Sequence, residues 1–173
     1  MNNKKWFRTA KFATYIVVMV LLYILQTTPG FLTVFGVKPN FVIPAAVCIA
    51  MHEGEFTGAF YGVLAGVLCD LGGFALAGFN AMILLAACTA VGLLVIYLLR
   101  PGIINFVLLL SAVMLARGLL DFLLNYVMWG YDHVWMVFVY DVLPGVIYTV
   151  AVSPLVYYLY TAVHAWFEGR MEA

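Results

Sequence analysis

Long runs of apolar residues alternate with short polar breaks along the whole chain, and this pattern restricts the fold more than any other feature. A helix needs about 20 mostly apolar residues to cross the hydrocarbon core of a bilayer. The predicted fold class is therefore an all-α integral membrane protein, a six-transmembrane-helix bundle. The predicted spans lie near residues 12–28, 39–52, 56–73, 80–99, 103–128 and 141–163. The predicted divisions are a basic N-terminus (1–11), a transmembrane domain (12–166) and a tail (167–173).

Composition supports a lipid environment. Hydrophobic residues make up 66% of the 173-residue chain and charged residues only 9%, far fewer charges than a soluble domain of this length needs on its surface. Eight basic and eight acidic residues cancel, so no electrostatic footprint for nucleic acid is expected. Cys48, Cys69 and Cys88 lie in apolar segments without the spacing of a disulfide framework, which indicates small core residues.

The second apolar segment is short, so it could be a re-entrant hairpin instead of a span. The distribution of basic residues favours six spans, because cytoplasmic loops are enriched in Lys and Arg. Six spans leave only Lys38 outside, whereas removing the second span would place Arg100 outside. The basic residues predicted to be cytoplasmic are Lys4, Lys5, Arg8, Lys11, Arg100 and Arg170. The predicted protein is multi-pass, with both termini on the cytoplasmic side of the cell membrane.

The third predicted span carries glycines at every fourth position. These are Gly54, Gly58, Gly62 and Gly66, with Asp70 next in the series. Small residues four apart form a groove that lets another helix approach closely within the bilayer. Packing within one bundle is the favoured interpretation. A groove for a partner's helix, or a face for homo-oligomer formation, is the alternative.

The fifth predicted span carries charge. Arg117, Asp121 and Asn125 are spaced by four and so share a helix face. An unpaired cation near mid-membrane costs about 2.5–3.5 kcal/mol, so Asp121 is expected to pair with Arg117. Asp70 and Asp141 are predicted in the same outer half. A structural ion pair is the favoured interpretation of this intramembrane polar cluster, with a docking site for a partner's polar residue or a proton or substrate relay as alternatives.

No catalytic constellation is apparent in the sequence. The histidines, His52, His133 and His164, are predicted on opposite sides of the membrane, and Glu53 and Glu55 are expected to be solvated at a cytoplasmic turn. Motifs for a nucleophile elbow, an HExxH zinc site or a phosphate-binding loop are missing from the sequence. We therefore expect no enzymatic activity, no cofactor and no metal.

Several local motifs between residues 25 and 100 form a familiar series. The motifs are Leu25-Gln26-Thr27, Phe35-Gly36-Val37-Lys38-Pro39-Asn40, Gly58-x3-Gly62-x3-Gly66-Val-Leu-Cys-Asp70, and Gly78 after a glycine-rich turn. With the chain length, the basic start and six spans, this series resembles the MreD family of rod shape-determining proteins. Members of that family often have aspartate at the position of Asn40. The Lys38-Pro39-Asn40 motif departs from the family there, although asparagine keeps the size and hydrogen bonding of aspartate.

The resemblance implies a non-enzymatic component of the bacterial cell-elongation machinery in the inner membrane. It implies binding to an MreC-like single-pass protein, in an assembly with MreB, RodA and a penicillin-binding transpeptidase that builds lateral peptidoglycan. It also implies an architecture like the substrate-binding subunit of energy-coupling-factor transporters, so a vitamin-type binding subunit is the rival interpretation. A vitamin site would need an outward-facing pocket with converging polar groups. The predicted outer loops are short and mostly apolar, which favours the scaffold.

Overall fold

The computed structural model describes residues 2–28, 30, 38–71, 78–124, 136, 139 and 142–172, and over these residues it contains six helices and no strand. In chain order the helices are α1 (Asn2–Thr27), α2 (Val42–Glu53), α3 (Glu55–Leu71), α4 (Phe79–Tyr97), α5 (Ile103–Phe122) and α7 (Leu143–Glu172). The prediction of an all-helical fold is confirmed for this part of the chain. The predicted boundaries at 11/12 and 166/167 fall inside continuous helices, because α1 and α7 extend past the apolar segments into the polar ends of the chain.

Four of these helices, α1, α4, α5 and α7, are long and apolar enough to cross a bilayer. Their candidate spans are Trp6–Thr27, Phe79–Tyr97, Ile103–Phe122 and Leu143–Arg170. This length and composition indicate a membrane-embedded helical protein. Helix α3 is slightly shorter, with 17 residues.

Helix α2 is the centre of the bundle. Its residues from Val42 to Met51 are all buried by the other helices. Twelve residues extend only about 18 Å at 1.5 Å per residue, less than the roughly 30 Å hydrocarbon core. A helix that is apolar on every side must be buried, and here other helices rather than lipid surround it.

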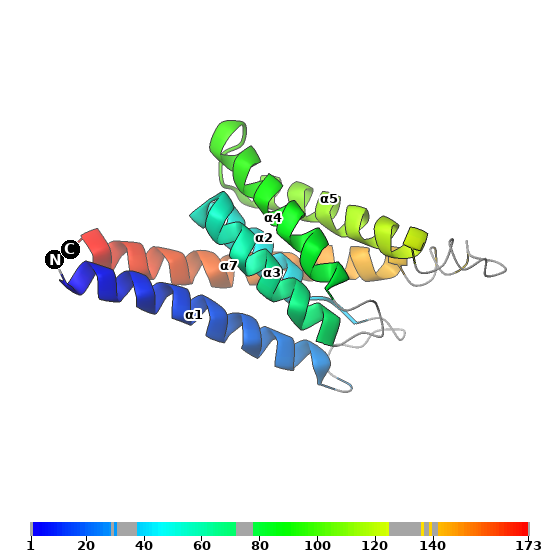
Figure 1. Ribbon diagram of the computed structural model, residues 1–173, viewed down its shortest axis with the longest axis horizontal. Helices are drawn as coiled ribbons and strands as arrows, with labels where there is room; N and C mark the ends of the chain where they lie inside the picture. The colour runs from blue at the N-terminus through cyan, green and yellow to red at the C-terminus, as the bar shows by residue number, and fades with distance from the viewer. Residues whose placement is uncertain are drawn as a thin grey trace.

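The helices alternate in direction, and the two chain termini lie together at one end of the molecule (Figure 1). The α2–α3 turn and the α4–α5 connection face that same end, which we call the termini end. The start of α2, the end of α3 and the start of α4 lie toward the opposite end, which we call the outer end after the side of the membrane predicted for it from the sequence. Basic Arg8, Arg100 and Arg170 therefore belong to the termini end, and Lys38 belongs to the outer end.

The glycine series packs inside the bundle. A Cβ atom on Gly62 would lie 2.5 Å from the Leu84 carbonyl oxygen of α4, and one on Gly58 would lie 2.6 Å from Ala50 Cβ of α2. A Cβ on Gly66 would meet the backbone of Ala81 in α4. Because α4 and α2 already cover this face, the alternative of a groove for a partner's helix is wrong for Gly58, Gly62 and Gly66.

Gly54 has a separate role from the other glycines of the series. Its φ of +85° is a backbone conformation that residues with a side chain rarely adopt, and it lies between α2 and α3. Gly54 therefore ends α2 and reverses the chain into α3.

Candidate functional site

Asp70, at the end of α3, binds the start of α4. Its carboxylate accepts hydrogen bonds from the backbone N–H groups of Gly78 (2.9 Å) and Asn80 (3.2 Å) and from Asn80 Nδ2 (2.8 Å). A carboxylate at a helix N-terminus satisfies backbone donors that have no partner within the helix and interacts favourably with the helix dipole. Asp70 therefore joins α3 to α4 at the outer end, as an acceptor rather than as a direct partner of an arginine.

Arg117 is connected to this group through Asn80. Arg117 Nε donates to Asn80 Oδ1 at 2.6 Å, so Asn80 bridges the arginine of α5 and the aspartate of α3. Asn80 is buried, with 3% of its surface exposed. Asn80 is not among the site residues predicted from the sequence, although a lone asparagine in an apolar segment was the available signal. The predicted cluster members Asn125 and Asp141 lie outside the residues that the structure describes.

The Asn40 side chain caps the central helix. Its Oδ1 atom accepts hydrogen bonds from the backbone N–H groups of Val42 (3.0 Å) and Ile43 (3.1 Å). The Asn40 backbone N–H donates to Thr149 Oγ1 of α7 at 3.0 Å. Aspartate could accept the same two hydrogen bonds, which gives a physical reason why asparagine and aspartate can replace each other at this position.

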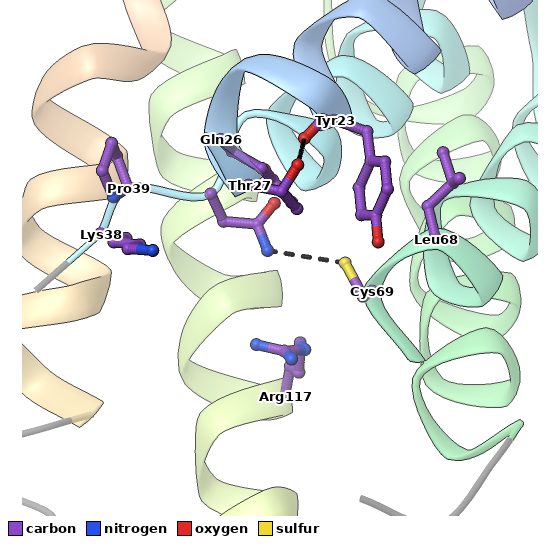
Figure 2. A pocket seen from close by; sticks show the side chains of 9 residues that line it. Tyr23, Gln26, Thr27, Lys38, Pro39, Leu68, Cys69 and Arg117 are labelled. Atoms are coloured by element: carbon purple, nitrogen blue, oxygen red, sulfur yellow. Dashed lines mark hydrogen bonds between the residues drawn. The ribbon is translucent and has the colours of Figure 1, made fainter. Parts of the chain in front are cut away.

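Two cavities at the outer end share Lys38, Asn40 and Arg117 in their walls, and we call them together the outer cleft. The larger, of about 510 Å³, is shown in Figure 2 and is also lined by Gln26 and Tyr23. The smaller, of about 220 Å³, adds Asp121 and Thr149. Polar groups thus converge at this end of the bundle, contrary to the expectation from the apolar loops.

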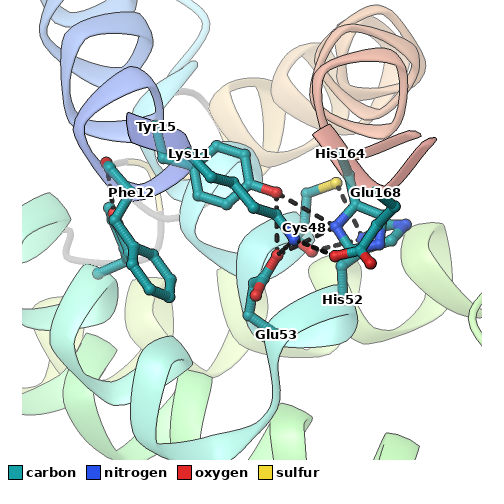
Figure 3. Close-up of polar contacts among 9 residues, drawn as sticks. Lys11, Phe12, Tyr15, Cys48, His52, Glu53, His164 and Glu168 are labelled. Atoms are coloured by element: carbon teal, nitrogen blue, oxygen red, sulfur yellow. Dashed lines mark hydrogen bonds and ion pairs between the residues drawn. The ribbon is translucent and has the colours of Figure 1, made fainter. Parts of the chain in front are cut away.

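A second polar cluster lies toward the termini end (Figure 3). Lys11 of α1 is only 2% exposed, and its Nζ atom lies 2.6 Å from Glu53 Oε1 of α2 and 2.6 Å from Glu168 Oε1 of α7. His164 Nδ1 also lies 3.0 Å from Glu53 Oε1, and the Tyr15 hydroxyl donates to Glu53 at 3.0 Å. We call these five residues the inner cluster.

The inner cluster corrects one sequence expectation. Glu53 was expected to be solvated, but it binds side chains from α1 and α7. The six-span prediction places His52 and His164 on the same side of the membrane, and their ring centroids are 5.0 Å apart; His133 lies outside the described residues. Local patterns could not reveal this cluster because its members come from three helices that are distant in sequence, with 38 residues between Tyr15 and Glu53 and 111 between Glu53 and His164.

Electrostatics keep Glu53 ionised. Burial by itself would raise the pKa of Glu53, but hydrogen bonds from His164 and Lys11, with the positive charge of Lys11, outweigh burial and lower it to about 2. Glu53 is the last residue of α2, outside the four candidate spans. At neutral pH the cluster is therefore an ionic connection between three helices.

A metal ion could in principle use Glu53, His164 and Glu168, whose ligand atoms lie within 4.8 Å of one another. The Lys11 ammonium group lies 2.6 Å from both carboxylates and already supplies a positive charge at that position. A metal would have to displace it. The arrangement fits a structural ion pair better than a metal centre.

Comparisons of the chain with protein-family models, with curated proteins and with solved structures found no match.

Proposed function

We propose that this chain is a non-catalytic membrane scaffold of the bacterial cell-elongation machinery, similar to MreD proteins. In this proposal it spans the cytoplasmic membrane six times with both termini inside, in an architecture like that of energy-coupling-factor substrate-binding subunits. It binds an MreC-like single-pass protein and thereby organises lateral peptidoglycan synthesis with MreB, RodA and a penicillin-binding transpeptidase. The chain itself acts by holding these partner proteins in position.

The observation that carries the proposal is how the residues of the MreD-like motifs interact. Gln26 Oε1 accepts a hydrogen bond from the backbone N–H of Phe41, Asn40 caps α2, and Asp70 binds Gly78. These motifs are separate in sequence but fix the outer ends of α1, α2, α3 and α4 to one another. Structural roles for the residues that carry the resemblance suit a protein that works as a rigid platform.

The glycine face is filled by α4, so the partner's helix must use another surface. Helix α3 has an opposite face with exposed aromatic residues, and together with α1 this face forms an apolar groove of about 460 Å³. The groove is lined by Phe12, Ile16, Phe56, Thr57, Phe60 and Tyr61. We assign the helix of the MreC-like partner to this groove, because a helix can pack there without displacing α4 from the glycines.

Photocrosslinking in membranes tests this assignment. A photoreactive residue replaces Phe60 (59% exposed) in the groove, and a matched control replaces Met82 (76% exposed) on α4. We expect the MreC-like protein of the same organism to crosslink through its transmembrane helix at position 60 and not at position 82. Equal crosslinking at both positions would indicate random collisions and contradict the assignment.

The outer cleft supports a second candidate function, a small-molecule binding subunit of an energy-coupling-factor transporter. Its larger cavity has the size of a small-ligand site, and polar side chains line it. This candidate predicts a tightly held vitamin in the purified protein, or an associated pair of ATP-binding cassette proteins. The scaffold proposal predicts neither.

A further inference from the structure

Among the described residues that line the outer cleft, positive charges outnumber negative ones. Lys38 and Arg117 line both of its cavities, and Asp121 is the one carboxylate among the described lining residues. The sum of these three charges is +1 whichever way they pair. Asp70 is not among these lining residues: Asn80 connects it to Arg117, and three hydrogen bonds from Gly78 and Asn80 hold its carboxylate. A cleft with this balance attracts an anion.

The donors of the cleft suit the oxygens of a phosphate group. Arg117 presents a planar guanidinium whose Nε atom is fixed by Asn80, and Lys38 adds an exposed ammonium group. Gln26 turns its carbonyl oxygen toward the Phe41 N–H, which leaves its NH2 end as a neutral donor. Arginine and lysine beside neutral donors are the usual components of a phosphate site.

The position of the cleft suits an amphiphilic ligand. Arg117 was predicted near mid-membrane, but it lies only five residues before the end of α5, so its long side chain can reach the level of lipid headgroups at the outer end of the bundle. Tyr23 and Leu68 add an apolar part to the wall of the larger cavity, and Met114 and Val146 add one to the smaller. A charged group beside apolar walls fits the junction between a headgroup and its hydrocarbon.

We propose that the outer cleft binds a phosphate ester, with Arg117 and Lys38 contacting the phosphate oxygens. The phosphate can belong to a lipid headgroup or to a soluble phosphorylated molecule, and the chemistry of recognition is the same. This inference goes beyond the scaffold function and concerns the isolated chain. It stands or fails independently of partner binding.

The test uses the purified full-length chain in detergent and two pairs of probes. Dioleoylphosphatidylglycerol is compared with dioleoylglycerol, and glycerol 3-phosphate is compared with glycerol, so each pair differs by a phosphate-bearing group. Titration of each probe while the melting temperature is followed gives an apparent affinity. We expect saturable stabilisation by at least one phosphate-bearing probe and none by its phosphate-free counterpart. Stabilisation by the lipid alone assigns a headgroup, and stabilisation by glycerol 3-phosphate assigns a soluble phosphorylated ligand.

Two variants with the same change in charge identify the site. Lys38→Gln removes an exposed cation of the cleft, and Arg100→Gln removes an exposed cation on the α4–α5 connection at the termini end. We expect Lys38→Gln to weaken the apparent affinity about fivefold, the typical effect of one basic residue on binding to an anionic lipid surface, and Arg100→Gln to leave it unchanged. Arg117→Gln should weaken it further. Because Arg117 also binds Asn80 and its loss could disturb folding, the decision rests on Lys38.

The proposal is overturned if no phosphate-bearing probe stabilises the chain, if Lys38→Gln binds as the wild type does, or if Arg100→Gln weakens binding equally.

Discussion

Lys11 and Glu53 form an ion pair, with Lys11 Nζ 2.6 Å from Glu53 Oε1 and 3% of the lysine side chain exposed. The pair connects the first helix to the central one, and Glu168 and His164 extend the connection to the last helix. Helix α1 packs mainly against α7 and α2, and these ionic contacts join it to both.

Replacing Lys11 with methionine should destabilise the chain by about 3 kcal/mol, because removing one member of a buried ion pair leaves the other charge uncompensated. The measurement is unfolding in detergent, by heat or denaturant. Arg100→Met serves as the control, since Arg100 is exposed, and its effect should be small. A double variant, Lys11→Met with Glu53→Gln, should lose less stability than the sum of the losses in the two single variants. Additive losses would mean that the two side chains do not interact.

Glu53 makes the stability depend on pH. Its pKa is lowered from 4.5 to about 2 in the folded chain, so its contribution is complete above pH 4.5 and is lost as the pH falls toward 2. The melting temperature of the wild type should therefore fall over this range more steeply than that of Glu53→Gln, which lacks the titrating group. Parallel curves for the two proteins would show that Glu53 does not have a lowered pKa.

Gly62→Ala should destabilise the fold by about 1–3 kcal/mol, the range for overpacking a tight contact. The added Cβ would lie 2.5 Å from the Leu84 carbonyl oxygen, so α3 and α4 would have to separate. Gly169→Ala is the matched control because a Cβ there meets nothing within 4 Å, and alanine favours the helix. If Gly62→Ala instead kept wild-type stability and lost only partner binding, the glycine face would be a docking surface after all.

Asn40→Ala should cost about 1 kcal/mol, the usual value for loss of a helix N-cap, because two backbone N–H groups of α2 lose their acceptor. Asn40→Asp should keep or increase stability, since a carboxylate accepts the same hydrogen bonds and interacts favourably with the helix N-terminus. Thermal unfolding of the two variants side by side checks this order. Equal losses in both would show that Asn40 does not act as a cap.

The helices and their order could be predicted from the sequence because each membrane span requires a run of about 20 mostly apolar residues, and such a run can be recognised within one segment of the chain. The glycine spacing likewise pointed to close helix packing, since Gly58, Gly62 and Gly66 must share one face wherever they pack. Which helix fills that face is a tertiary property, and no local pattern distinguishes α4 from a partner. The central place of α2 was also hidden, because a helix that is apolar on all sides shows no periodicity toward either lipid or protein.

The polar sites were harder to predict. Arg117 was recognised because a cation in an apolar segment needs a partner, but its hydrogen bond goes to Asn80, on another helix. Lys11 was interpreted only as a topology signal, although it lies inside the protein. Its partners Glu53 and Glu168 are on α2 and α7. Contacts of this kind depend on which helices become neighbours, which spacing along one helix does not determine.

The most direct test of the proposed scaffold function is the mass of a purified complex. The chain is co-expressed with the MreC-like single-pass protein of the same organism, and the detergent-solubilised material is analysed by size-exclusion chromatography with light scattering. The scaffold function predicts one stable species that contains both proteins in a fixed ratio. Separate elution of two folded proteins, neither retaining the other, would contradict it.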